Sequence, residues 1–193
     1  MITAAQLKAY IRKLSNNLNI NSQILLRNYF HEKFLERVSL SEHRLNFILK
    51  GGTLIAAIVG INSRSTVDID ATIKNWPINI NSFEKMFNNI LSIELNDNVR
   101  MSLINIENIR NNAKYHGLKV SIESEFEMIK QIIKIDVTTG EHITPREVDY
   151  QLPSLFNDNE ICLMAYNIET ILAEKYETVI SRSTLNTRMR DFL

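Results

Sequence analysis

Two aspartates separated by one residue are the first feature of the chain that could do chemistry. Asp68 and Asp70 lie in a segment whose β-branched residues predict a strand over residues 66–73. Alternation along a strand would put both carboxylates on one face, and such close like charges repel unless a cation lies between them. Magnesium prefers oxygen ligands, usually carboxylates together with substrate phosphates. The pair is therefore a candidate metal site, although an Asp-x-Asp taken alone is more often a solvated strand end or a turn.

A glycine pair precedes the aspartates. Gly51 and Gly52 are followed by an apolar segment, residues 53–59, that predicts a short buried helix ending at Gly60. Glycines at a turn into a helix let the backbone approach a ligand closely, and the N–H groups of a helix start favour an anion such as phosphate. Thr53 adds a hydroxyl group. A phosphate-binding turn beside two carboxylates is what a complex of magnesium and a nucleoside triphosphate requires.

A third carboxylate would complete two metal sites. Asp136 is the only acid in the apolar run of residues 132–137. Burial of an unpaired carboxylate is unfavourable, so a buried acid is paired, hydrogen-bonded or bound to metal. We expect Asp136 to be the third metal ligand, with a structural, hydrogen-bonded acid as the alternative.

The elements that must position these residues predict an α+β fold with a mixed sheet flanked by helices. Helical spacing follows Thr3 and Gln6, which form a capping box, and recurs over residues 22–35. Ser41 is expected to start a third helix that leads to Phe47, Ile48 and Leu49. Further helices are predicted from Asn81 or Ser82 and from Asn167, and strands over residues 101–106, 118–122, 128–137, 148–152 and 162–165. We divide the chain into an N-terminal helical segment (1–46), a core with the sheet (47–166) and the start of a C-terminal helical part (167–193), which we expect to be cut short.

Composition limits the class of protein. The 193 residues carry a formal net charge of zero, so no global field attracts nucleic acid or membrane. A local basic face from Lys114, Lys119, Lys130 and Lys134 remains open. No stretch has the length of a membrane span, and the N-terminus lacks the apolar core of a secretory signal. The single cysteine, Cys162, excludes an internal disulfide and fits the cytoplasm.

The remaining candidate ligands give no pattern. The four histidines have no metal-ligand spacing, and His31 and His43 are expected on helix surfaces. Cys162 lies in an apolar run and is expected in the core.

At this point the sequence resembles a known family. Lys50-Gly51-Gly52-Thr53, a short apolar helix and Arg64-x-Thr66-x-Asp68-Ile69-Asp70 resemble the nucleotidyltransferase toxins of the AbiEii/AbiGii type, which have the DNA polymerase β-like nucleotidyltransferase fold. The segment from Glu169 to Lys175 is similar to the family's helix with its functional lysine, and Arg190-Asp191-Phe192 is similar to the start of its last motif. The resemblance covers residues 47–193. Thr66 stands where the family commonly has serine, which keeps a hydroxyl, and the family's helical C-terminal half is missing.

The resemblance implies an enzyme that moves a nucleoside monophosphate from an NTP to an acceptor, using two magnesium ions. Catalysis is expected to involve Asp68, Asp70, Asp136, Lys175 and Asp191, with the first three as metal ligands. Nucleotide binding is expected to involve Gly51, Gly52, Thr53, Arg64, Thr66, Lys175 and Arg190. Without the resemblance, Lys175 is a solvated helix lysine, Arg64 a loop charge, and Arg190 with Asp191 an exposed ion pair.

The resemblance also implies a biological role. Toxins of this kind belong to bacterial toxin–antitoxin or phage abortive-infection systems, some relatives add nucleotides to tRNA, and a separate antitoxin protein is the expected partner. Two alternatives stay open. The acceptor could be the hydroxyl of a small molecule or protein, or the chain could be a non-catalytic interaction module in which the acids are structural. The sequence leaves the preferred NTP and the oligomeric state undetermined.

Overall fold

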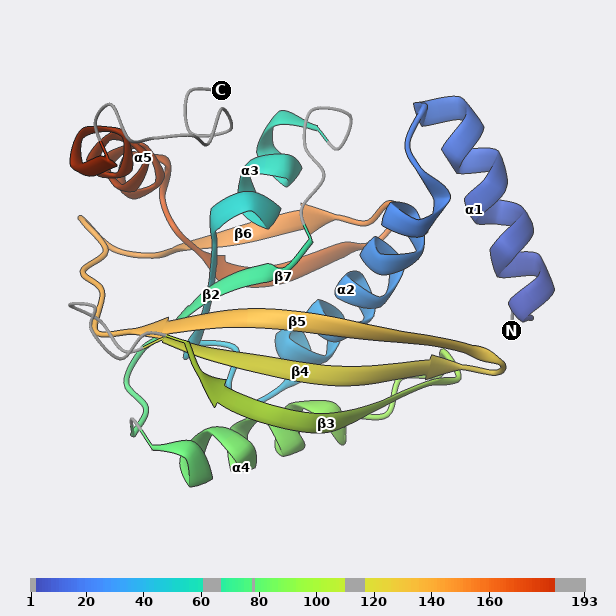
Figure 1. Ribbon diagram of the computed structural model, residues 1–193, viewed down its shortest axis with the longest axis horizontal. Coiled ribbons are helices and arrows are strands. Elements are labelled where there is room, and N and C mark those ends of the chain that lie inside the picture. The colour runs from blue at the N-terminus through green and yellow to red at the C-terminus, as the bar shows by residue number, and fades with distance from the viewer. Residues whose placement is uncertain (1–2, 61–66, 78, 110–116, 183–193) are drawn as a thin grey trace.

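The chain folds around a mixed, seven-stranded sheet (Figure 1). The computed structural model describes residues 3–60, 67–77, 79–109 and 117–182, and within them the strands have the order β3-β4-β5-β2-β1-β7-β6. The strands are β1 (Phe47–Lys50), β2 (Ile69–Ile73), β3 (Val99–Asn108), β4 (Gly117–Phe126), β5 (Ile129–Thr139), β6 (Val148–Pro153) and β7 (Glu160–Ala165). Strand β1 is parallel to β7 and β2 is parallel to β5, whereas the other neighbours are antiparallel. The predicted α+β class with a mixed sheet is confirmed.

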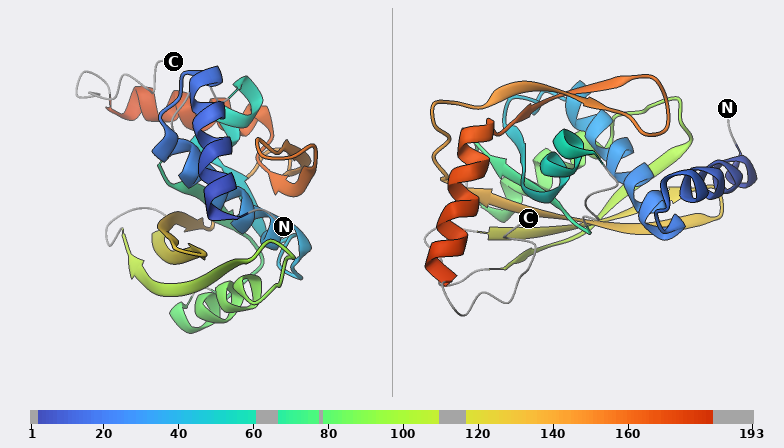
Figure 2. Two further views of the ribbon diagram at one scale, coloured as in Figure 1. Left: turned by 90° about the vertical axis from the view of Figure 1, so that its right-hand side faces the viewer. Right: turned by 90° about the horizontal axis from the view of Figure 1, so that it is seen from above.

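The helices flank this sheet (Figures 1 and 2). They are α1 (Ala4–Leu18), α2 (Ser22–Leu40), α3 (Gly51–Val59), α4 (Ile80–Leu91) and α5 (Ile168–Arg182). Figure 1 and the left view of Figure 2 place α3 and α5 on the opposite side of the molecule from α4. The capping box predicted for α1 is present, because the side chains of Thr3 and Gln6 each accept a hydrogen bond from the other's backbone N–H. No helix of the described residues is long and apolar enough to span a membrane.

Aromatic side chains join the helices to the centre of the sheet. The ring of Phe34 in α2 lies 5.8 Å from that of Phe47 in β1 and is stacked at 6.2 Å on that of Phe87 in α4, centroid to centroid. All three side chains are fully buried. Aromatic pairs at such distances add to the stabilisation that burial itself provides, so these rings hold the short strand β1 against two helices.

The segment before the glycine pair differs from the prediction. Residues 47–49 were expected to end a helix, but they form strand β1, and residues 42–46 are a turn. All four residues of β1 are buried, because the strand lies at the middle of the sheet with layers on both faces. A strand buried on both faces has a continuous apolar run, which periodicity cannot distinguish from a buried helix segment.

Other boundaries shift by a few residues. Helix α4 begins after Asn79, whose side chain caps it, rather than at residue 81 or 82. Asn167 caps α5 as predicted, since its Oδ1 accepts a hydrogen bond from the backbone N–H of Thr170 at 2.7 Å. The five predicted strands after residue 100 are all present.

Three predictions about single residues are wrong. Cys162 is exposed, because it is on the outward-facing side of β7, whose buried residues alternate with it. His31 and His43 are buried, with 3% and 2% of their surface exposed. His43 packs edge-on against the Trp76 ring, and His31 lies on a face of α2 that meets α3 rather than solvent.

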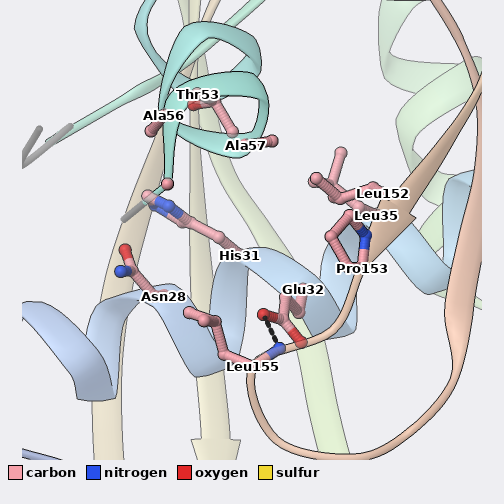
Figure 3. Close-up of a pocket in the computed structure, with 11 residues that line it drawn as sticks. Asn28, His31, Glu32, Leu35, Thr53, Ala56, Ala57, Leu152, Pro153 and Leu155 are labelled. Atoms are coloured by element: carbon pink, nitrogen blue, oxygen red, sulfur yellow. Dashed lines mark hydrogen bonds between the residues drawn. The ribbon is translucent and has the colours of Figure 1, made fainter. Parts of the chain in front are cut away.

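A cavity of about 190 Å³ lies between α2, α3 and the hairpin of β6 and β7 (Figure 3). Asn28, His31 and Glu32 line it from α2, and Thr53 lines it from α3. Among the described residues, Nε2 of His31 has no hydrogen-bond partner, whereas Glu32 accepts hydrogen bonds from Ser154 Oγ and from the Leu155 N–H. Burial lowers the pKa of His31 to about 3 and raises that of Glu32 to about 7.

These two neighbours give opposite pH dependences of stability. His31 is neutral in the folded protein, and in the unfolded chain its pKa is 6.5. Its contribution to the free energy of unfolding is therefore fully present above pH 6.5 and is lost as the pH falls, because the unfolded chain then gains a proton. Glu32 keeps its proton to a higher pH in the folded protein than in the unfolded chain. Its contribution to the free energy of unfolding is therefore fully present below pH 4.5 and is lost as the pH rises towards 7. Their effects offset each other between these limits.

Replacing His31 should therefore expose the dependence that comes from Glu32. The quantity of interest is the free energy of unfolding at about pH 5 minus that at about pH 7.5. This difference should be about 2 kcal/mol more positive in His31→Met than in the wild type, because each pKa unit corresponds to about 1.4 kcal/mol. Urea denaturation at the two pH values measures this difference. His142→Met is the matched control, since His142 is exposed, and an equal change in both variants would contradict the assignment to burial.

Candidate functional site

Four charged residues form one row across the centre of the sheet. Lys50 in β1 is paired with Asp70 in β2, Asp70 with Asp136 in β5, and Asp136 with Lys119 in β4. Directly paired residues point to the same face of a sheet, so the row alternates lysine, two aspartates, lysine along one face. The sequence predicted that Asp70 and Asp136 would meet, and the register of β2 and β5 brings them together.

Asp68 joins the row from outside the strand. It was expected within a strand over residues 66–73, but β2 begins at Ile69, and Asp68 lies in the bend before it. The alternation argument therefore does not apply to it. Its side chain nevertheless turns to the same site, because Lys119 Nζ lies 3.4 Å from Asp68 Oδ2 and 3.1 Å from Asp136 Oδ1.

The glycine pair and Asp70 are in direct contact. Gly52 donates its backbone N–H to Asp70 Oδ2 at 3.1 Å, so a carboxylate from β2 caps the positive end of α3. Gly51 has φ +64°, and a Cβ there would lie 2.6 Å from Asp70 Cγ, which leaves room for glycine alone. Burial raises the pKa of Asp70, the Gly52 N–H lowers it, and the neighbouring charge of Asp136 raises it again, with a net increase.

The donor set fits a divalent cation, although the ligands do not yet converge. Asp136 Oδ1 is buried, and the cation beside it in the described part of the chain is Lys119 Nζ at 3.1 Å. A buried carboxylate oxygen of this kind needs a positive charge. However, no three His, Cys, Asp or Glu side chains meet as metal ligands do within the described part of the chain. The acids have the chemistry of metal ligands, but the described structure does not bring three of them together.

Next to the row lies a buried network that the sequence did not predict. Glu141 Oε2 accepts hydrogen bonds from Lys50 Nζ at 2.5 Å, Tyr166 Oη at 2.6 Å, Thr138 Oγ1 at 2.8 Å and Thr72 Oγ1. Burial alone would raise the pKa of Glu141, but Lys50 and these hydrogen bonds outweigh it, and the pKa lies below its usual range. The network fixes the end of β1, and therefore the point at which α3 begins.

Helix α5 reaches the same network. Glu174 Oε1 lies 3.7 Å from Lys50 Nζ, and this contact brings that turn of α5 towards β1. Lys175, the predicted triphosphate ligand, follows directly and is half-buried. Arg64, Thr66, Arg190 and Asp191, the other predicted site residues, lie outside the described residues.

The possible basic face is not a continuous positive patch. Lys119, Lys130 and Lys134 share one sheet face through the register of β4 and β5, and Lys114 lies outside the described residues. Lys119 forms ion pairs with two aspartates, and Lys130 forms ion pairs with Glu123 and Glu125. Basic and acidic side chains are therefore mixed on this face.

Lys119 and Glu141 are the site residues that sequence reasoning missed. Lys119 was noted only as part of a basic face, and its alternation with Leu118 and Val120 placed it opposite the core without showing which strand it would meet. Glu141 directly follows Gly140 at the end of a strand and has the appearance of a solvated turn acid. Only the strand order brings both residues to Asp136 and Lys50.

Comparisons with solved structures identify the fold. The chain is similar to a candidate nucleotidyltransferase from H. pylori, with 16% identity, a TM-score of 0.56, and 89% of this chain and 66% of that one covered. It is also similar to JHP933 from Helicobacter pylori, with 18% identity, a TM-score of 0.53, and coverage of 89% and 63%. The chain therefore spans less than two thirds of the length of either protein. No curated protein matches it.

The sequence itself matches a family over residues 33–193. That range includes the glycine pair, the three aspartates, Lys119, Glu141 and all of α5. The family is described as the nucleotidyl transferase AbiEii toxin of type IV toxin–antitoxin systems. The resemblance found in the sequence is thus confirmed, and the chain belongs to the AbiEii nucleotidyl transferase toxin family.

Proposed function

We propose that the protein transfers a nucleoside monophosphate from an NTP to an acceptor hydroxyl in a magnesium-dependent reaction of the EC 2.7.7 type. The observation that carries the proposal is the pairing of Asp70 with Asp136 on adjacent parallel strands, beside the glycine turn that begins α3. Carboxylates bind magnesium, and the N–H groups of a helix start bind phosphate. The two side by side match what a complex of magnesium and a triphosphate requires.

Each residue has a defined part in this proposal. Asp68, Asp70 and Asp136 would hold two magnesium ions, which would polarise the reacting phosphate and lower the pKa of the acceptor hydroxyl. Asp70 is already oriented by Gly52, and the N-cap residue of α3, Lys50, makes no side-chain hydrogen bond to the start of the helix, so the other N–H groups there would be available to the triphosphate. Lys175 would offset charge on the pyrophosphate leaving group. We further propose Thr53, Thr66, Arg64 and Arg190 as phosphate contacts and Asp191 as a further catalytic acid.

We propose a tRNA end as the acceptor and an antitoxin protein as the partner, in a cytoplasmic toxin–antitoxin or abortive-infection system. Family membership supports a toxin that works with an antitoxin. The mixed charge of the exposed β4 and β5 face gives little attraction to a long RNA. We therefore place the contact with RNA at the acceptor end alone, near the row of aspartates.

Removing one predicted metal ligand should abolish transfer. Asp136→Asn and Asp68→Asn should each lower the transfer of α-labelled nucleotide to total tRNA by about 100-fold or more, because a charge that stabilises the transition state is lost. The assay uses each of the four NTPs with magnesium, and circular dichroism verifies folding.

Glu123→Gln is the matched control for these variants. Glu123 is an acid of the same sheet face, paired in register with Ile132 and remote from the row, so its loss should leave transfer unchanged. Full activity in folded Asp136→Asn would contradict the assignment of Asp136 as a metal ligand. Label on a protein or small molecule that requires Asp68 would preserve the chemistry and replace tRNA as the acceptor.

A Cβ at Gly51 should displace Asp70. Gly51→Ala should lower transfer by about 100-fold, because the added carbon occupies the space of the Asp70 carboxyl group. Gly60→Ala is the control, since Gly60 also has a positive φ of +103° but no atom within 4 Å of the added carbon. Both variants place alanine at a positive φ, which costs on the order of 1–3 kcal/mol, so thermal melting of each variant verifies that it is folded at the temperature of the assay. Equal transfer by the two variants would exclude a role for the contact between Gly51 and Asp70.

A further inference from the structure

Lys119 occupies the space between two predicted metal ligands. Its Nζ lies 3.4 Å from Asp68 Oδ2 and 3.1 Å from Asp136 Oδ1. The register of β4 and β5 fixes its Cα opposite Asp136, and its side chain is about a quarter exposed. The ammonium group therefore has the place and the charge that a cation shared by these carboxylates would have.

The charges around this point do not balance. Asp68, Asp70 and Asp136 bring three carboxylates, and Lys119 brings one ammonium, so their ionised forms have an excess of two negative charges. Lys50, at the other end of the row, is bound to Glu141 and lies near Glu174. Its charge is therefore largely compensated, and among the described residues Lys119 is the lysine whose ammonium forms ion pairs with two of the aspartates.

The ammonium of a lysine can be displaced from such carboxylates by a divalent cation. Its four-carbon stem is flexible and its ammonium is strongly hydrated, and a partly exposed ion pair is weak. A divalent cation has twice the charge and can bind both carboxylates at shorter distances. The acids of this site do not converge in the described structure, and the ammonium between Asp68 and Asp136 is a direct physical reason.

We propose that Lys119 is a positioning residue that serves as an internal counter-ion of the aspartates and competes with the divalent cation for them. This inference rests on the proposed function, and it adds an order of events. The metal alone binds weakly because it must displace Lys119. Metal that arrives with a triphosphate binds well, because the phosphates supply further oxygen ligands and attract the displaced ammonium. Lys119 thereby couples metal binding to nucleotide binding.

The experiment measures Mn²⁺ binding by the electron paramagnetic resonance signal of the free ion, without nucleotide and at fixed ionic strength. Lys119→Met should bind Mn²⁺ about tenfold more tightly than the wild type, corresponding to the loss of a competing interaction of about 1.4 kcal/mol. Lys119→Gln, which is neutral and polar, should show the same gain if the methionine variant does not fold. Lys119→Arg keeps a cation and should bind as weakly as the wild type.

Lys134→Met is the matched control for general electrostatics. Lys134 is exposed on β5 and shares the face of Lys119, so its loss removes the same charge without freeing a carboxylate. Its Mn²⁺ affinity should stay within about twofold of the wild type, as expected for a solvent-screened charge. Equal gains in Lys134→Met and Lys119→Met would overturn the proposal, as would unchanged or weaker binding in folded Lys119→Met and Lys119→Gln.

A second titration, with Mn²⁺ and a non-hydrolysable triphosphate analogue, separates this inference from the proposed function. The wild type and Lys119→Met should differ less in the presence of the analogue than in its absence. Binding of Mn²⁺ with the analogue by the wild type, without any difference between the variants in either titration, would overturn only the role of Lys119. No Mn²⁺ binding by any variant in either titration would overturn the proposed function and this inference together.

Discussion

The contact between the Asp70 carboxyl group and the backbone of Gly51 and Gly52 sets the geometry of the elements around it. A carboxylate that accepts the Gly52 N–H must stand directly under the first turn of α3, and there is no room beside it for a side chain at position 51. The helix can therefore begin only here, immediately after Lys50. In turn, β2 must lie beside β1 in the one register that brings Asp70 opposite Lys50.

The charges that flank Asp70 are compensated in two different ways. On one side, Lys50 is enclosed with Glu141, whose Oε2 atom accepts hydrogen bonds from four groups, and such a satisfied buried network is rigid. On the other side, the ammonium of Lys119 lies between the carboxylates of Asp68 and Asp136 in a partly exposed place. The side of the site with Lys50 and Glu141 is thus rigid. The side with Lys119 is less constrained, and it contains the predicted metal ligands Asp68 and Asp136.

The sequence predicted the parts of this arrangement that depend on local pattern. The alternation of Val120 and Ile122 reveals β4, and the cap at Asn167 reveals α5, because these signals lie within a few residues. The glycine pair and the aspartates were found for the same reason. Strand β1 was misread because a strand buried on both faces has no alternation. His31 and Cys162 were misplaced because burial depends on which neighbours a face meets, and no local pattern records that.

The missed site residues have a shared physical cause. Lys119 contacts Asp136 across 17 residues of the chain and Glu141 contacts Lys50 across 91, and only the strand order β4-β5-β2-β1 brings these pairs together. A single sequence shows a lysine on a strand and a glutamate after a glycine, both of which are usually solvated. Their importance comes from the sheet, not from their neighbours in the chain.

The parallel pairing of β1 with β7 has a consequence for when the site can form during synthesis of the chain. Strand β1 forms early in the chain, yet its partner ends at Ala165, and Tyr166 completes the hydrogen bonding of both Leu49 and Glu141. Pairings between such distant segments form late in folding. During synthesis, the glycine turn therefore emerges from the ribosome more than a hundred residues before the contacts that fix it. The arrangement of Asp70, the glycine turn and Glu141 is therefore complete only after residues 160–166 have been translated.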